Sequence, residues 1–178
     1  MWEESQLLSH RIIFLSQPID SGVANRIISQ LLLLEADSQE KQIDLYINCG
    51  GGSVKDGLAI IDAIQCLHAP VSTICVGLAG SMAAWILAAG KPGLRFATPN
   101  AEVMIHQMST HLQGVTEDIL RYSQRLMRLQ TSLINMLAKW TGQDVARIQE
   151  DIQKDYFMTA QEALDYGIID SVLQPVDK

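Results

Sequence analysis

Residues 69–90 form an uncharged stretch that constrains every fold this chain could adopt. About twenty such residues are long enough to span a bilayer. The first part, 71–76, is rich in β-branched residues and has the length of a strand. Residues 77–80 contain the glycines of a turn, and residues 81–90 are predicted to form a short helix that ends at its glycine. We therefore expect a buried strand, turn and helix rather than a membrane span.

The composition indicates one globular domain in a reducing compartment. The chain has 178 residues, of which 48% are hydrophobic and 19% charged, and this excludes a disordered chain. Acidic residues outnumber basic ones by 20 to 13, which argues against a nucleic-acid surface. Three cysteines without a CxxC pair favour neither a disulfide framework nor a zinc site. Since the acidic residues Glu3 and Glu4 do not suit a secretion signal, we expect a single cytoplasmic domain, residues 1–178.

Short apolar strands alternate with helical segments along the chain. Strands are predicted at 12–15, 43–48, 71–76, 94–97, 102–106 and 168–173. Helices are predicted at 21–36, 54–67, 81–90 and 116–140, and after Thr159 as far as Gly167. Ser21 is the expected N-cap of the first helix, and Thr159 and Glu162 form the capping box of the last. This alternation predicts an α/β fold with mostly parallel pairing.

Several residues could carry chemistry, although each also has an ordinary structural interpretation. The glycines of 49–53 lack phosphate-loop spacing, and they could form a tight turn or present backbone N–H groups to an oxyanion. Ser81 occupies the place of an N-cap, His106 closes an apolar strand, and Asp155, at the end of a predicted helix, would by default be a solvated carboxylate. No histidine spacing supports a metal site. Spacing alone does not join these three side chains.

Four segments of the chain resemble the Clp protease proteolytic subunit. They are GLAGSMAA (77–84), FATPNAEVMIHQ (96–107), TGQ (141–143) and KDYFMTAQEALDYGIID (154–170). The similarity runs in order, and nearly without gaps, from about Leu7 to Leu173. It implies an α/β fold of the crotonase-like ββα spiral type, with residues 116–140 as a protruding handle helix.

The resemblance implies an ATP-dependent serine endopeptidase of protein quality control. Ser81 would be the nucleophile, His106 the general base and Asp155 the carboxylate that orients the imidazole. The backbone N–H groups of Gly52 and Met82 would form the oxyanion hole. No metal or other cofactor is implied for this chain, because ATP is used by a partner, an AAA+ unfoldase of the Clp type. Members form heptameric rings, stacked as a homo-oligomeric tetradecamer, whose chamber receives unfolded polypeptide.

The resemblance also implies a docking cleft for the unfoldase on the outer surface of the ring. Its residues in this sequence are Tyr46, Cys66, Ile74, Phe96 and Leu173. Asp44 stands where the family usually has an aromatic residue, which makes this cleft less apolar than usual.

The chain departs from the family pattern at segments that would control assembly. Residues 49–50 are Cys-Gly instead of Ser-Pro, and residues 108–110, Met-Ser-Thr, replace a proline and a pair of glycines. Gln153-Lys154 lacks the acid of a charge pair often used between rings, and the alignment from Leu7 leaves no axial segment. These departures leave a second function open, that of a weakly active or regulatory paralogue in mixed Clp rings. A third, an acyl-CoA hydratase or isomerase on the same fold, is disfavoured by Ser81 and His106 in matched motifs.

Overall fold

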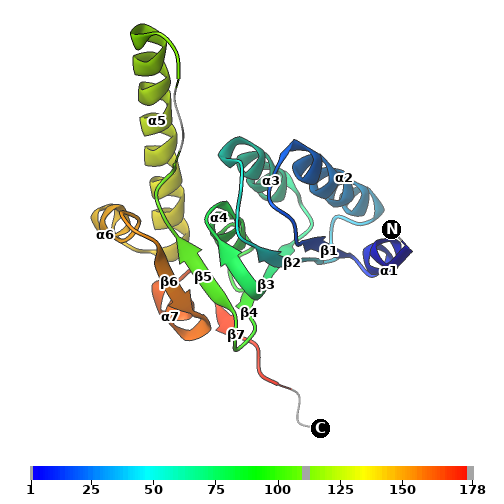
Figure 1. The fold of residues 1–178 in the computed structure, drawn as a ribbon. Coiled ribbons are helices and arrows are strands. Elements are labelled where there is room, and N and C mark those ends of the chain that lie inside the picture. Colours follow the sequence, from blue (N-terminus) through cyan, green and yellow to red (C-terminus); the bar gives the residue numbers. More distant parts are fainter. Residues whose placement is uncertain (1, 110–112, 176–178) are drawn as a thin grey trace.

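A seven-stranded mixed sheet is the frame of the molecule in a computed structural model, which describes residues 2–109 and 113–175 and side chains from residue 6 (Figure 1). The strands are β1 Ile12–Leu15, β2 Ile43–Cys49, β3 Val71–Gly80, β4 Arg95–Ala97, β5 Glu102–Ile105, β6 Tyr156–Thr159 and β7 Ser171–Val172. The helices are α1 Trp2–Ser9, α2 Ser21–Asp37, α3 Val54–Cys66, α4 Met82–Ala88, α5 Thr116–Thr141, α6 Val145–Asp151 and α7 Ala160–Tyr166.

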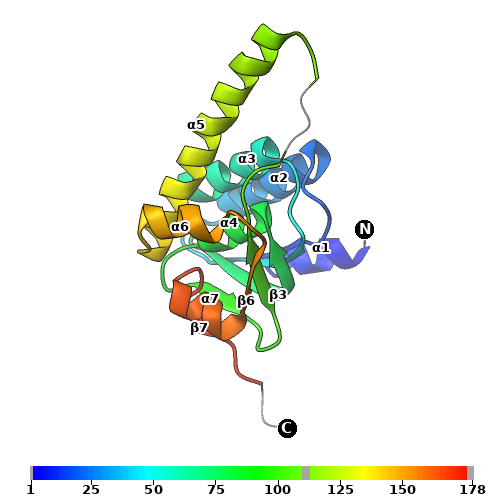
Figure 2. The ribbon, with the colours of Figure 1, turned by 60° about the vertical axis from the view of Figure 1, so that its left-hand side comes forward.

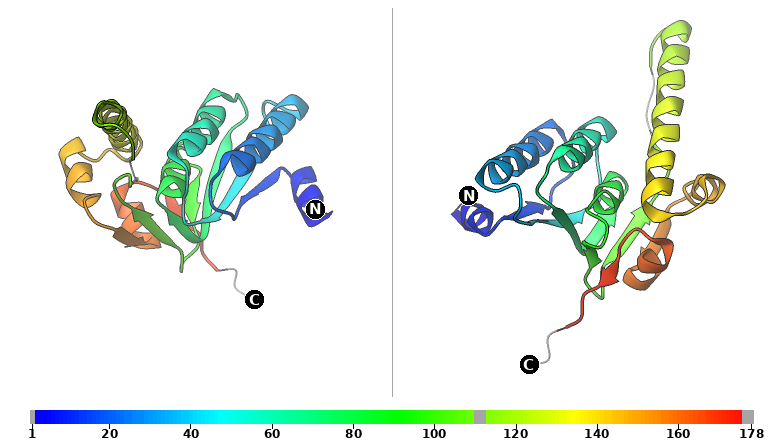
Figure 3. Two further views of the ribbon diagram at one scale, coloured as in Figure 1. Left: turned by 45° about the horizontal axis from the view of Figure 1, so that its top comes forward. Right: turned by 180° about the vertical axis from the view of Figure 1, so that it is seen from behind.

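The sheet is parallel along the order β1-β2-β3-β4-β7, and it branches at β3. The C-terminal half of β3 pairs with β5 in parallel, and β5 pairs with β6 in antiparallel. Helices α2, α3 and α4 pack beside one another over the β1–β3 part of the sheet (Figure 3). This arrangement confirms the predicted α/β fold, including the crotonase-like architecture with its protruding long helix.

The uncharged stretch 69–90 forms the centre of the core. Its strand, β3, is longer than expected, because residues 78–80 pair with β5 after residues 73–75 have paired with β4. The predicted turn at 77–80 is therefore wrong: pairing with β5 keeps residues 78–80 in the strand, and Gly77, with a φ of 86°, lies between the two paired parts. No helix in the described ranges is long and apolar enough to cross a membrane.

Helix α4 is enclosed on every side. All seven of its residues are buried, which suits a helix that is apolar all round. The Thr73 hydroxyl on β3 donates to the Leu87 carbonyl at 2.7 Å, and the Trp85 indole donates to the Leu133 carbonyl on α5 at 2.9 Å. These two bonds hold the middle and the end of α4 between the sheet and the long helix, and Ser81 lies directly before its first residue.

Helix α5 projects far beyond the rest of the fold (Figures 1 and 2). Only its C-terminal half packs against the other elements of the fold, through the buried side chains of Leu133, Ile134 and Leu137. The helix ends at Gly142, which adopts a left-handed φ of 76° and donates its N–H to the Ala138 carbonyl. The predicted boundaries, 116–140, are confirmed to within one residue.

An ion pair between a buried arginine and a half-buried aspartate fastens the base of α5 to the sheet. Arg95, on β4, is 7% exposed and donates from Nε to Asp170 at 2.9 Å. Its Nη1 donates to the carbonyls of Trp140, at the end of α5, and Gly167, at the end of α7. Burial alone would raise the pKa of Asp170, but hydrogen bonds from Arg95 and the Gly93 N–H outweigh it and leave that pKa below its usual value. The Arg95–Asp170 pair therefore stays charged at neutral pH.

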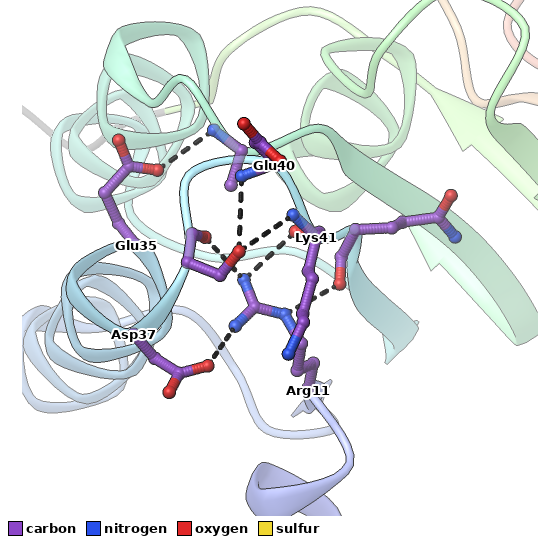
Figure 4. Close-up of polar contacts among 8 residues, drawn as sticks. Arg11, Glu35, Asp37, Glu40 and Lys41 are labelled. Carbon is purple, nitrogen blue, oxygen red and sulfur yellow. Dashed lines mark hydrogen bonds and ion pairs between the residues drawn. The ribbon is translucent and has the colours of Figure 1, made fainter.

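A second arginine closes the turn between α2 and β2 (Figure 4). The Nε of Arg11 donates to the Gln42 carbonyl, and its Nη2 donates to the carbonyls of Ser38 and Lys41. Its Nη1 pairs with the Asp37 carboxylate at 3.0 Å. The guanidinium thus replaces solvent at the carbonyls of this turn and fixes β1 beside β2.

Four further elements and one cap differ from the sequence expectations. Helix α1 and strand β6 were not expected, and the helix expected to end at Asp155 ends at Asp151 as α6. Strand β6 exists because β5 offers it an antiparallel partner. The N-cap of α2 is Asp20 rather than Ser21, since the Asp20 carboxylate accepts the Val23 N–H at 2.8 Å. The predicted final strand shrinks to β7, because Ile168 and Ile169 turn into the core. The capping box of Thr159 and Glu162 is confirmed.

Candidate active site

Ser81 connects β3 to α4 in a strained backbone conformation. Its φ of 52° and ψ of −128° lie in a region that residues with a side chain seldom adopt. The Ser81 N–H donates to the Met104 carbonyl on β5 at 2.8 Å, which helps to hold this conformation. Ser81 occupies the N-cap position of α4 as expected, but its side chain makes no capping bond. Such strain persists where surrounding structure imposes it, and it is typical of functional positions.

His106 lies between Ser81 and Asp155. Its Nε2 is 2.8 Å from the Ser81 Oγ, and its Nδ1 is 3.4 Å from the Asp155 Oδ1. A neutral imidazole with its proton on Nδ1 would donate toward the carboxylate and accept from the serine hydroxyl. The structure therefore brings together the three side chains that spacing could not join.

The antiparallel register of β5 and β6 explains how His106 meets Asp155. Ile105 pairs with Tyr156, so the next residue of one strand and the preceding residue of the other face each other. The Gln107 N–H also donates to the Ile152 carbonyl at 2.7 Å, which draws the two connecting segments together. Asp155 directly precedes β6 and does not end a helix as expected. Its side chain is 63% exposed, so solvent reaches the carboxylate.

The loop after β2 that contains Gly50, Gly51 and Gly52, called the glycine loop here, packs directly against Ser81. A Cβ added to Gly51 would lie 2.6 Å from the Ser81 Cβ, and one added to Gly52 would lie 2.3 Å from the Ile19 carbonyl oxygen. Both glycines have positive φ, 105° and 149°. Ile19 is joined to the loop by its N–H to the Gly51 carbonyl and by its own carbonyl to the Ser53 N–H. The Gly52 N–H takes no part in this pairing.

One pocket is lined by all the residues expected for catalysis and the oxyanion hole except Asp155. It measures about 80 Å³, and Gly52, Ser81, Met82 and His106 contribute to its wall. The remaining lining residues are Val54, Trp85, Gln107, Met108, Ser109, Gln130, Leu133, Ile134 and Ile152. Sequence reasoning did not assign the α5 members of this set to the site. The helical spacing of Leu126, Leu129, Leu133 and Leu137 predicts that Leu133 is buried. No local pattern predicts that Leu133 lines the same pocket as Ser81.

A wider groove continues from this pocket between α5 and α6. It measures about 630 Å³ and shares Gln107, Met108 and Ile152 with the smaller pocket. Met108 thus lines both the pocket and the groove, and Ser109 lines the pocket. Thr110, the third residue of that unusual segment, lies outside the described residues.

The residues expected to form a docking cleft are only partly brought together. Tyr46, Ile74 and Phe96 are cross-strand neighbours on β2, β3 and β4, and Phe14 stacks on Tyr46 with ring centroids 5.6 Å apart. The Leu173 N–H donates to the Ala97 carbonyl, so Leu173 lies beside β4. Cys66 is the exposed last residue of α3 and comes from the helical layer.

The remaining candidates do not form a metal centre in the described ranges. No group of three or more histidine, cysteine, aspartate and glutamate side chains there could hold a metal ion. His68 instead binds Glu35, with its Nδ1 3.0 Å from that carboxylate. His111 lies outside the described residues. Compared with known protein families, residues 3–176 match the model described as Clp protease.

Proposed function

Because the chain belongs to the Clp protease family, we propose that it is a serine endopeptidase that cuts unfolded polypeptides with Ser81, His106 and Asp155. The observation that carries this proposal is the 2.8 Å contact between the Ser81 Oγ and the His106 Nε2, made by a serine in a strained backbone conformation. A serine that served only as a helix cap would not need either feature.

The proposed reaction is acyl transfer in two steps. As the Ser81 Oγ bonds to the peptide carbonyl carbon, His106 accepts the hydroxyl proton at Nε2. The C–N bond then breaks, and His106 returns that proton to the departing amine. Water, activated by the same imidazole, hydrolyses the acyl-serine and restores the hydroxyl. Asp155 holds the Nδ1 proton in place and stabilises the imidazolium that forms during each step.

The oxyanion of each tetrahedral intermediate would be bound by the N–H groups of Gly52 and Met82. Met82 is the first residue of α4, where backbone N–H groups have no partner within the helix. Gly52 lines the same pocket, and its N–H is outside the pairing that joins the loop to Ile19. Two preorganised donors of this kind stabilise developing charge without rearrangement.

Assembly into stacked heptameric rings forms part of the proposal. On the outer part of α5, Leu120, Tyr122 and Met127 are 59%, 42% and 70% exposed, which is costly for a lone chain. Contact between rings along α5 would cover these side chains and enclose the active sites in a cytoplasmic chamber. The row of Tyr46, Ile74 and Phe96, with Leu173 beside it, would dock the AAA+ unfoldase that consumes ATP and supplies unfolded substrate.

A second candidate, a weakly active subunit of mixed Clp rings, is favoured by the exposure of Asp155. The neighbouring pair Gln153-Lys154 cannot supply the opposite charges usual between rings, so contact with an identical ring would leave this carboxylate poorly positioned. A paralogous subunit that provides an acid opposite Lys154 would restore the contact and raise the activity.

The test of the first candidate is loss of hydrolysis in Ser81→Ala. We expect peptidase activity to fall by about 10⁶, as when other triads lose their nucleophile, and labelling by a fluorophosphonate to disappear. Ser29→Ala, an exposed serine on α2, is the matched control and should keep both. Full peptidase activity in Ser81→Ala would refute the assignment, and turnover of acyl-CoA thioesters would favour a hydratase instead.

The second candidate is tested by adding a paralogous Clp subunit whose own nucleophile has been replaced by alanine. A rise in peptide hydrolysis as this inactive partner is titrated would show that mixed rings align the triad of this chain. Activity that is high without the partner and stays flat would support a self-sufficient homomer. Native mass measured in parallel shows which assembly is present at each point.

A further inference from the structure

The side chain of Cys49, which is not one of the proposed catalytic residues, holds the glycine loop through hydrogen bonds. Cys49 ends β2 and is 4% exposed. Its Sγ lies 3.1 Å from the Gln17 carbonyl oxygen, and the Gly51 N–H donates to the same sulfur at 3.3 Å. One thiol therefore bonds to both the glycine loop and the segment before Ile19.

The donor and acceptor roles of this thiol are compatible. Burial raises the pKa of Cys49 and outweighs the N–H contacts from Gly51 and Ile19 that lower it, so the sulfur keeps its proton at neutral pH. The S–H can then donate to the nearest carbonyl, that of Gln17, while a sulfur lone pair accepts the Gly51 N–H. The longer approach to the Gly51 carbonyl, 3.6 Å, is a poorer alternative for the same proton.

We propose that Cys49 is a positioning residue for the oxyanion-binding N–H of Gly52. Its two bonds fix the Gly51 backbone at a φ of 105°, directly before the peptide that carries this N–H. Without the thiol, the Gly51 N–H would be buried with no acceptor, and the loop would rotate to satisfy it. The backbone bonds to Ile19 hold the loop through the Gly51 carbonyl and the Ser53 N–H, and they do not orient the Gly51 N–H.

This inference rests on the proposed serine-peptidase function, and the test separates the two. The rate constant for labelling of Ser81 by a fluorophosphonate reports the oxyanion site, because the phosphoryl oxygen occupies it. Hydrogen exchange at the Gly51 and Gly52 amides reports the loop itself and needs no activity. Both are measured on the full chain for Cys49→Ala, Cys49→Ser and Cys75→Ala.

Cys75→Ala is the matched control, since Cys75 is also a fully buried thiol but lies in the middle of β3. We expect Cys49→Ala to lower the labelling rate by about 10- to 100-fold, in line with small displacements in active sites, and to speed exchange at Gly51. Cys49→Ser, which keeps a donor and an acceptor, should restore the labelling rate to within about threefold of the original. Cys75→Ala should keep the original rate and exchange while lowering thermal stability.

Unchanged labelling in Cys49→Ala, or equal losses in the alanine and serine variants, would overturn the positioning role. Unchanged exchange at Gly51 in Cys49→Ala would also overturn it, whether or not the enzyme is active. If the unsubstituted chain is neither labelled nor active, the proposed function fails, and the exchange measurement alone decides whether Cys49 holds the loop.

Discussion

Ser81 and Asp155 lie on opposite sides of His106, and the fold holds them very differently. Ser81 is enclosed by β5, the buried helix α4 and the glycine loop. The loop comes so close to the Ser81 side chain that only glycine fits at position 51. Asp155 is 63% exposed and 3.4 Å from the imidazole, in a segment that joins α6 to β6. The proposed nucleophile is thus positioned by the core of this chain, whereas the proposed orienting carboxylate lies at the surface. Substitutions on the two sides should differ accordingly in size.

Among the substitutions beside Ser81 and Asp155 that compare the two sides, Gly51→Ala is expected to have the largest effect. The new Cβ would overlap the Ser81 Cβ and force a side chain into a φ of 105°, so both the nucleophile and the adjoining N–H would move. We expect fluorophosphonate labelling of Ser81 to fall by about 10³. Gly93→Ala is the control, because Gly93 has a φ of 87° but nothing within 4 Å of an added Cβ. If the two variants label equally well, contact with the glycine loop does not position the nucleophile.

A smaller effect is expected from Asp155→Asn. Triads with a buried carboxylate lose about 10⁴ in kcat when the acid becomes an amide. Water already screens the exposed carboxylate of Asp155, so we expect a loss of about 10² in kcat with little change in KM. The control is Asp165→Asn on α7, which removes the same charge from an exposed position. A loss near 10⁴ would mean that assembly buries Asp155 and would remove the contrast between the two sides.

Tyr166→Phe tests how far the chain itself supports the carboxylate side. The buried Tyr166 hydroxyl donates to Asp151, the last residue of α6, at 2.8 Å, and the Arg147 guanidinium lies over its ring. Losing a hydrogen bond to a charged acceptor should lower the free energy of unfolding by about 1.5 kcal/mol. Denaturant unfolding would measure this, and Asp151→Asn with the double variant would show the coupling. An unchanged free energy of unfolding would mean that α6 is held by its apolar contacts alone.

The same tyrosine gives a pH dependence with a definite sign. Burial, together with the hydrogen bond to Asp151, raises the pKa of Tyr166 above its ordinary value of 10.0. The unfolded chain therefore ionises first, and the stability contributed by Tyr166 is complete below pH 10 and is lost as the pH rises above it. Tyr166→Phe should lose less stability than the original chain between neutral pH and the alkaline range.

The two sides also differ in what the sequence could predict. The boundaries of α2, α3 and α5 followed from local patterns to within one residue, and the proposed triad residues followed from long matched motifs. The start of β3 and the position of α4 followed from the uncharged stretch, but the pairing of residues 78–80 with β5 did not. The strain at Ser81 and the fit of Gly51 depend on contacts between β2, β3 and β5, which no local pattern encodes. Strand β6 was missed for the same reason: its pairing with β5, which sets Asp155 opposite His106, is a tertiary event.

Gly50→Pro should have the smallest effect and tests whether the glycine loop is already as rigid as it can be. Unlike Gly51 and Gly52, Gly50 has no positive φ, and an added Cβ would meet nothing within 4 Å. The preceding residue, Cys49, is in a strand, which is the conformation that a following proline favours. Proline would restrict the unfolded chain, so we expect a gain of about 0.5 kcal/mol in the free energy of unfolding and at most about a twofold faster labelling of Ser81. A large gain in labelling would show that the glycine loop beside Ser81 is mobile. The fold would then hold Ser81 only somewhat more firmly than Asp155. A loss of stability would show that the Gly50 N–H or its freedom of φ is needed where β2 ends.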